Sequence, residues 1–256
     1  MEGSQLLMPA VLGAGAVATG LARSHQAKKL AHLLDARRSS VAELLDLQAT
    51  VAAQMGAGSF RERVKLSGAI VCNEPLTAPW SGEPCVAFTN TTTALLEVRE
   101  ERTSTDSAGN TTTEVSWERR EETLQQLERR CRFELQQGGQ GLPVDPEGAE
   151  LDLETVFNQV DPPTTANTGL YRQLGTRRVE SLLRASGTVL VVAECSDASG
   201  NLQLQAPGGR GLFVVRRGTE DDFSRSIRRW RRVWSLSTWG LSAAAVLSLA
   251  WIVLRG

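Results

Sequence analysis

Residues 94–105 read ALLEVREERTST, residues 106–110 read DSAGN, and residues 111–122 read TTTEVSWERREE. The outer two stretches alternate between apolar and polar residues, and the middle one is made of turn formers. This pattern predicts a long antiparallel hairpin. One face of the hairpin carries both signs of charge, which predicts a solvated face with cross-strand ion pairs among Glu97, Arg99, Glu101, Glu114, Glu118 and Arg120.

Further strands are predicted on both sides of the hairpin, at 64–71, 84–90, 187–194, 202–206 and 211–215. Helical pieces are expected at 153–159, which ends before Asp161-Pro-Pro163, and at 171–185. Residues 61–219 are long enough for one domain with its own core. We therefore expect a mainly β (α+β) globular domain over this range.

The C-terminal tail predicts a transmembrane helix. Residues 233–254 carry no charge, and at about 1.5 Å per residue they span roughly 30 Å, the thickness of the hydrocarbon core of a bilayer. A helix at 220–232 is expected to lead into this span. Arginine and tryptophan favour the membrane interface, which makes these residues candidates for interface contacts: Arg225, Arg228, Arg229, Trp230, Arg231, Arg232 and Trp234.

The N-terminal region predicts a second span and a helical linker. Residues 6–22 are uncharged, so 1–22 is interpreted as a transmembrane helix; the preceding residues lack the positive charge of a secretory signal. The linker, 23–60, is expected to hold amphipathic helices at 22–37 and 40–54. Ser40-Val-Ala-Glu43 matches a capping box at the start of the second helix. The predicted fold class is thus a mainly β domain between two transmembrane helices, with N-terminal amphipathic helices.

The inventory of reactive residues predicts no catalytic site, no metal site and no cofactor. Both histidines, His25 and His32, precede the expected domain, so it lacks the base of a Ser-His-Asp or Cys-His site. A net charge of −1 argues against a nucleic-acid partner. The cysteines lack the paired spacing of zinc or redox motifs. Free thiols and a disulfide such as Cys72 with Cys85 both remain open; the other two cysteines are Cys131 and Cys195.

Several short motifs, in their order, resemble the GIDE family: Val64-Lys-Leu-Ser-Gly68, Asn73-Glu-Pro-Leu76, Leu151-Asp-Leu-Glu-Thr-Val-Phe157 and Leu202-Gln-Leu-Gln-Ala-Pro207. Members are membrane-bound RING-type E3 ubiquitin ligases of mitochondrial and chloroplast outer membranes, and their middle part is called the Beside-A-Membrane domain. The resemblance implies a structural or partner-binding role for Gly68, Pro75, Leu76, Leu153, Thr155 and Val156.

This sequence departs from the ligases at the RING finger. A RING needs about eight Cys and His ligands for two zinc ions, whereas the sequence has four cysteines and two histidines. We therefore expect a prokaryotic, cyanobacterial-like relative, and whether the chain is an enzyme stays open. The leading hypothesis is a membrane-anchored adaptor without a catalytic site, whose partners are the lipid bilayer and a membrane-proximal protein.

Three alternatives to the adaptor are a ligase subunit that works with a separate RING protein, a carboxylate hydrolase, and a structural protein that self-associates through its spans. An exposed apolar patch or open strand edge favours the adaptor; a pocket holding a carboxyl group of raised pKa favours the hydrolase. The positive charges flanking the spans place the domain in the cytoplasm, at a bacterial inner or thylakoid membrane. The resemblance implies the alternative, an organelle outer membrane with the domain in the intermembrane space.

Overall fold

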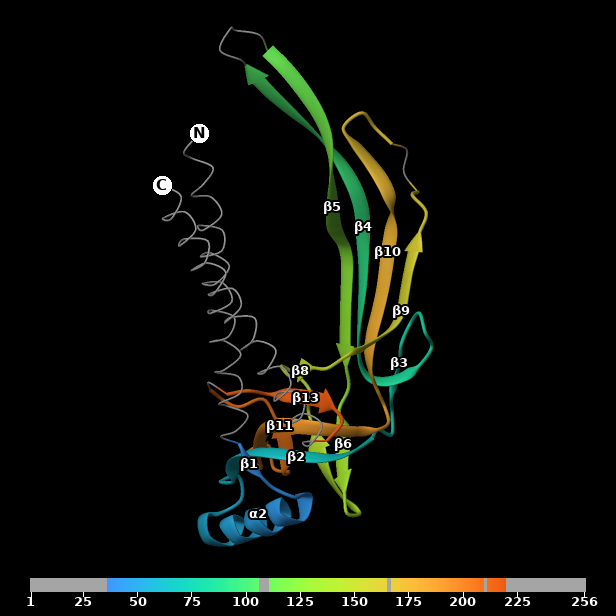
Figure 1. Cartoon of the computed structure of the whole chain (residues 1–256). Helices are drawn as coiled ribbons and strands as arrows, with labels where there is room; N and C mark the ends of the chain where they lie inside the picture. Colours follow the sequence, from blue (N-terminus) through green and yellow to red (C-terminus); the bar gives the residue numbers. More distant parts are fainter. Residues whose placement is uncertain (1–35, 106–110, 165–166, 210, 220–256) are drawn as a thin grey trace, which may run out of the picture. The chain divides into compact units, whose positions relative to one another are not determined.

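The computed structural model describes residues 36–105, 111–164, 167–209 and 211–219 (Figure 1). These residues form strands and a single α-helix, and they divide into two compact units. Unit 1 takes residues up to 69 together with 136–142 and 188 onwards, and unit 2 takes 70–135 and 143–187.

Unit 1 is organised around two long antiparallel strands, β2 (Arg61–Val71) and β11 (Thr188–Ser196). Their register runs from Thr188 opposite Ala69 to Ser196 opposite Arg61. The order β2-β6-β7-β12-β11, with the additional pairing of β2 and β11, closes five strands into a ring. The remaining strands of this group are β1 (Arg37–Arg38), β6 (Phe133–Gln137), β7 (Gln140–Val144), β12 (Gln203–Gln205) and β13 (Val214–Arg217).

The helix of unit 1, α2 (Val41–Met55), confirms the helix predicted at 40–54. The Ser40 hydroxyl accepts a hydrogen bond from the Glu43 amide at 3.2 Å, as the capping motif predicts. Val41 and Leu44 are fully buried. The Gln48 amide donates to the Asp197 carboxylate at 3.1 Å, and the second oxygen of this carboxylate accepts from the Phe60 amide at 2.9 Å.

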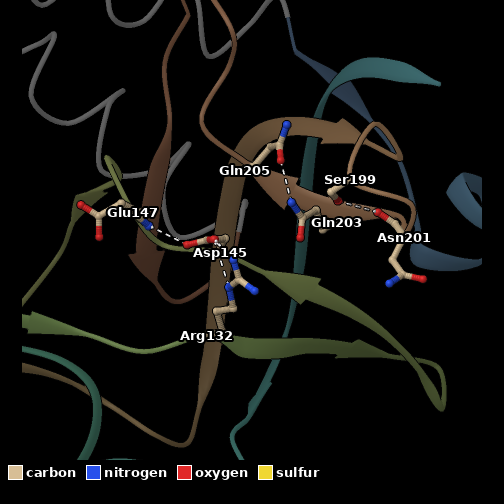
Figure 2. A network of polar contacts seen from close by, with 7 residues as sticks. All are labelled: Arg132, Asp145, Glu147, Ser199, Asn201, Gln203 and Gln205. Atoms are coloured by element: carbon tan, nitrogen blue, oxygen red, sulfur yellow. Dashed lines mark hydrogen bonds and ion pairs between the residues drawn. The ribbon is translucent and has the colours of Figure 1, made fainter. Parts of the chain in front are cut away.

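The turn predicted after the strand at 187–194 is present in unit 1, at Asp197–Asn201. The Gly200 amide donates to the Asp197 carbonyl at 2.9 Å. Figure 2 shows the Ser199 hydroxyl on the Asn201 carbonyl at 3.4 Å, and the Gln203 amide donating to Gln205 at 2.7 Å. These contacts lead the chain from β11 into β12.

Unit 2 is built from a sheet with the order β3-β4-β10-β9, in which β5 also pairs with β4. Its core at the base of the sheet consists of Ala78, Cys85, Phe88 and Leu182, with Leu76 and Val156 packed against it. Arg132 binds the Asp145 carboxylate at 2.7 Å and 3.0 Å, and the Glu147 amide donates to the same group (Figure 2). The strands of this sheet are β3 (Leu76–Thr77), β4 (Pro84–Thr105), β5 (Thr111–Arg130), β9 (Glu154–Asp161) and β10 (Tyr171–Arg184). The two-residue strand β8 (Glu150–Leu151) falls within unit 2 but is not part of this sheet.

The two helical pieces predicted at 153–159 and 171–185 are wrong, because both segments are strands, β9 and β10. Residues 176–182 of β10 pair with β4 on one side and with β9 on the other. This double pairing satisfies the backbone groups of the segment from neighbours that are remote in sequence, which outweighs the helix propensity of its Arg, Glu and Leu residues.

The predicted fold class, a mainly β (α+β) domain between two transmembrane helices with N-terminal amphipathic helices, is also wrong. Within the described residues α2 is the one helix, and no helix there is long and apolar enough to cross a membrane. The predicted two-pass location in a bacterial inner, thylakoid or organelle outer membrane is corrected by the same finding. The apolar segments behind that prediction, 6–22 and 233–254, lie outside the described residues, as does nearly all of the helix expected at 22–37.

Candidate binding surface on unit 2

The hairpin of β4 and β5 confirms the antiparallel return predicted for 111–122. Its register runs from Ala87 opposite Arg130 to Thr105 opposite Thr111, with a bulge at Leu124 between Thr123 and Gln125. On its other edge β4 is covered by β10 only as far as Val98, which lies opposite Tyr171. Beyond that point the hairpin continues as two strands, as Figure 1 shows.

Strand β5 forms an open edge of this sheet: within the described residues it pairs with β4 alone. Its side chains are exposed along the whole strand except at Trp117 and Arg130, which are half-buried. The Arg172 guanidinium lies 3.8 Å from the centre of the Trp117 ring, in a cation–π contact. An edge of this kind has backbone donors and acceptors that another strand could use.

Two ion pairs cross the hairpin, one on each face, and each joins a residue of the predicted set to a residue outside it, so the predicted pairing on a single face is only partly met. Arg120 contacts Glu100 on β4 and Glu118 on its own strand, both at 2.8 Å, and Arg119 lies 3.6 Å from Glu97. The hydrogen bond from Arg120 is the main cause of a lowered pKa at Glu118. Exposed pairs of this type contribute little stability.

Large apolar side chains are exposed almost entirely on unit 2. Met55 of α2 is the exception in the described residues; the others are Val115, Leu124, Leu127, Val160, Leu170, Tyr171 and Leu174. We call Val160, Leu170, Tyr171 and Leu174 the distal patch, because they flank the paired ends of β9 and β10. A Cβ atom added at Gly175, beside Leu174, would lie 3.1 Å from Val160. The register sets Tyr171 beside Val98 and Val160 beside Arg177 and Thr93, so the patch takes in both faces of this end of the sheet. Exposed apolar groups can mark interaction sites.

The base of the same sheet holds a fully buried carboxylate, Glu180. Its two oxygens accept hydrogen bonds from the backbone amides of Trp80 and Ser81, both at 2.9 Å. Burial raises the pKa of Glu180, but hydrogen bonds from Ser81, Trp80 and Asn90 outweigh it, so the pKa is lowered. The carboxylate therefore stays ionised and fixes the loop that connects β3 to β4.

The loop that Glu180 fixes presents Trp80 to Phe157 on β9. The ring centres lie 5.6 Å apart in a tilted arrangement, and the Arg178 guanidinium lies 5.8 Å from each ring. Arg178 is held by both oxygens of Asp161, at 2.6 Å and 3.1 Å. Glu180 and Arg178 are not predicted as site residues from the sequence, because both fall in the segment predicted as a helix at 171–185. Only the strand register brings them to Trp80.

The structure places the residues singled out by the family resemblance in different environments. Leu76 and Val156 pack on the same buried cluster, and the Thr155 hydroxyl lies 2.9 Å from that of Ser181. Pro75 is exposed, Leu153 is half-buried, and Gly68 lies on β2 of unit 1 opposite Val189. A structural or partner-binding role for these residues stays a prediction. The seven residues predicted at a membrane interface, from Arg225 to Trp234, lie outside the described residues.

The four cysteines are free thiols in this structure. Burial raises the pKa of Cys85 to about 11 and that of Cys195 to about 12. The described residues contain no group of three or more His, Cys, Asp or Glu side chains placed to hold a metal ion. The carboxyl groups with a resolved shift in that part of the chain, Glu118, Glu180 and Asp197, all have a lowered pKa. A lowered pKa suits an ion-pair partner or a hydrogen-bond acceptor, whereas a general acid needs a raised one.

Comparison with known proteins gives one match. No curated protein and no solved structure matches the chain. A family model named GIDE, described as E3 Ubiquitin ligase, matches residues 100–250. This range is more than half of the chain. It includes β5, β9, β10 and the end of β4, which belong to the long-stranded sheet, and it agrees with the resemblance drawn from the motifs. The chain therefore belongs to the GIDE family of E3 ubiquitin ligase-related proteins.

Proposed function

We propose that this chain is a protein-binding module of the GIDE family, which recognises a partner protein through the distal patch of unit 2 and does not modify it. The observation that carries the proposal is the exposure of the patch: Leu170 is 73 % exposed, Val160 53 %, Leu174 42 % and Tyr171 41 %. Burying such side chains against a partner releases about 25 cal/mol per Å² of apolar surface.

The surroundings of the patch suit a protein partner. The Arg172 guanidinium is stacked on Trp117 near the same end of the sheet, and arginine and aromatic residues are frequent contributors to protein interfaces. The patch also rests on paired strands: the Leu170 carbonyl accepts a hydrogen bond from the Arg99 amide at 2.9 Å. A patch held on strands loses little conformational entropy when it binds.

The test is site-specific photo-crosslinking in cells that make the full-length chain. A photoreactive amino acid at Leu170 is compared with the same amino acid at Met55, which is 72 % exposed but lies on unit 1. We expect one or a few discrete protein adducts from position 170 that position 55 does not give, and loss of these adducts when Leu174→Ser is added. The same adducts from both positions, or none from either, would refute the proposal.

A second candidate function is favoured by the description of the matching family model. It is a ligase subunit that takes part in ubiquitin transfer together with a separate RING protein. The full-length chain would then increase substrate modification in a reconstituted mixture of activating enzyme, conjugating enzyme, RING protein and ubiquitin. Adducts from position 170 that include no RING protein and no conjugating enzyme would favour the adaptor over the ligase subunit.

A further inference from the structure

The open edge of β5 has a charge pattern that matches itself in antiparallel orientation. Most charged residues near the middle of the strand have an intramolecular partner, such as Arg177 for Glu121 at 3.1 Å and Glu128 for Arg130. Glu122 and Arg129 are different: both are exposed, and neither has an ion-pair partner among the residues that the structure describes. They lie on either side of two exposed apolar residues, Leu124 and Leu127.

The register of the hairpin puts these groups on one face of the sheet. Glu122 lies opposite Ala94 of β4, Leu127 opposite Asn90, and Arg129 opposite Phe88. Alternate residues of a strand point to the same face, so Ala94, Asn90 and Phe88 share one face of β4. Directly opposed residues lie on the same face, so Glu122, Leu127 and Arg129 share that face too. The bulge at Leu124 is what keeps Glu122 in phase with Arg129.

We propose that two copies of this chain associate by pairing their β5 edges antiparallel, with a two-fold axis at Gln126. In that register Leu127 of each copy lies opposite the bulge at Leu124, and Arg129 lies opposite Glu122. The axis repeats each contact, so two new ion pairs and two apolar contacts form around the paired glutamines. This interaction goes beyond the proposed function, which uses the distal patch.

Neighbouring registers give less favourable charge pairs. Moving the axis to the bulge at Leu124–Gln125 sets Arg129 opposite Arg120 and Glu128 opposite Glu121, so charges of the same sign meet on both faces. Moving the axis to Leu127 leaves Arg129 opposite the bulge and gives it no acidic partner. An axis placed between two residues outside the bulge would set residues of opposite faces against each other. This is excluded, because a two-fold axis perpendicular to the sheet maps each face onto itself. Of these three registers, only the one at Gln126 places an acidic residue opposite Arg129.

A charged edge is also a common protection against pairing, and charge reversal separates the two possibilities. Glu122→Arg in the full-length chain places two arginines opposite each other at both symmetric positions, as Arg129→Glu does with two glutamates. We expect each single variant to weaken the dimer by about tenfold in Kd, measured by sedimentation equilibrium. The double variant, with both charges exchanged, should return to the wild-type Kd. Glu114→Arg, on β5 but outside the overlap, serves as the matched control.

A second measurement fixes the register. In antiparallel strands, directly opposed Cα atoms lie about 4.5–5.5 Å apart, which is within the range of a disulfide. Gln126→Cys should therefore give a dimer joined through residue 126 under oxidised glutathione, identified by mass spectrometry of the linked peptide, and Ser116→Cys should not. A chain that is monomeric at all concentrations tested, a dimer insensitive to both single reversals, or a folded double variant that fails to regain the dimer would each overturn the proposal.

Discussion

Replacing the buried Glu180 by glutamine should destabilise unit 2 far more than a change this small normally does. The carboxylate accepts two backbone hydrogen bonds, one on each oxygen, and has no exposed surface. Glutamine keeps one acceptor and turns an NH2 group toward the other amide. One charge-assisted hydrogen bond is lost and a buried donor is left without an acceptor, which together cost about 3 kcal/mol.

The assay is amide hydrogen exchange of Trp80 and Ser81, because these amides donate the affected bonds. A loss of about 3 kcal/mol corresponds to about a hundredfold faster exchange if they exchange through opening of the unit. Glu114→Gln, an exposed change on β5 of the same unit, should stay within about 0.5 kcal/mol of wild type. Less than a tenfold acceleration in the Glu180 variant would refute the reasoning.

The same carboxyl group predicts an acid dependence. Its pKa is lowered in the folded chain, so its contribution to stability is complete above the unfolded pKa of about 4.3 and is lost as the pH falls through the folded value. The difference in unfolding free energy between wild type and Glu180→Gln should therefore shrink in acid. A difference that stays constant between neutral pH and the acid limb would contradict the proposed ionisation.

Three further changes test other parts of the fold. Gly175→Ala puts a Cβ atom 2.6 Å from the Asp161 carbonyl oxygen and should lower the free energy of unfolding of unit 2 by about 2 kcal/mol, measured by urea denaturation. Leu44→Ala removes a fully buried side chain of α2 and should cost about 2–5 kcal/mol in the same assay applied to unit 1. Iodoacetamide at pH 8 should modify the half-buried Cys72 well before Cys195, whose thiol is buried and has a pKa raised to about 12. A neutral Gly175 variant, a Leu44 variant that loses less than about 1 kcal/mol, or equal alkylation of the two thiols would contradict these expectations.

Much of the hairpin could be predicted from local sequence. Alternation from Ala94 to Thr105, turn formers at 106–110 and the return from Thr111 onwards define two strands and their partner, because hairpin register depends on neighbours in the chain. The α2 helix is local too: Ser40 and Glu43 supply its first cap within one turn. The family resemblance, drawn from short motifs in order, is confirmed by the match over 100–250.

The tertiary structure decided the features that depend on distant partners. Residues 171–184 contain good helix formers, yet they form β10, since β4 and β9 supply hydrogen bonds on both edges. That register brings Glu180 to Trp80, 100 residues away in sequence, and Arg178 to Asp161, 17 residues away. The division into two units and the open edge of β5 have the same origin. The local sequence pattern indicates that a segment can form a strand. Which strand edge stays unpaired depends on how all the strands of the sheet pair with one another.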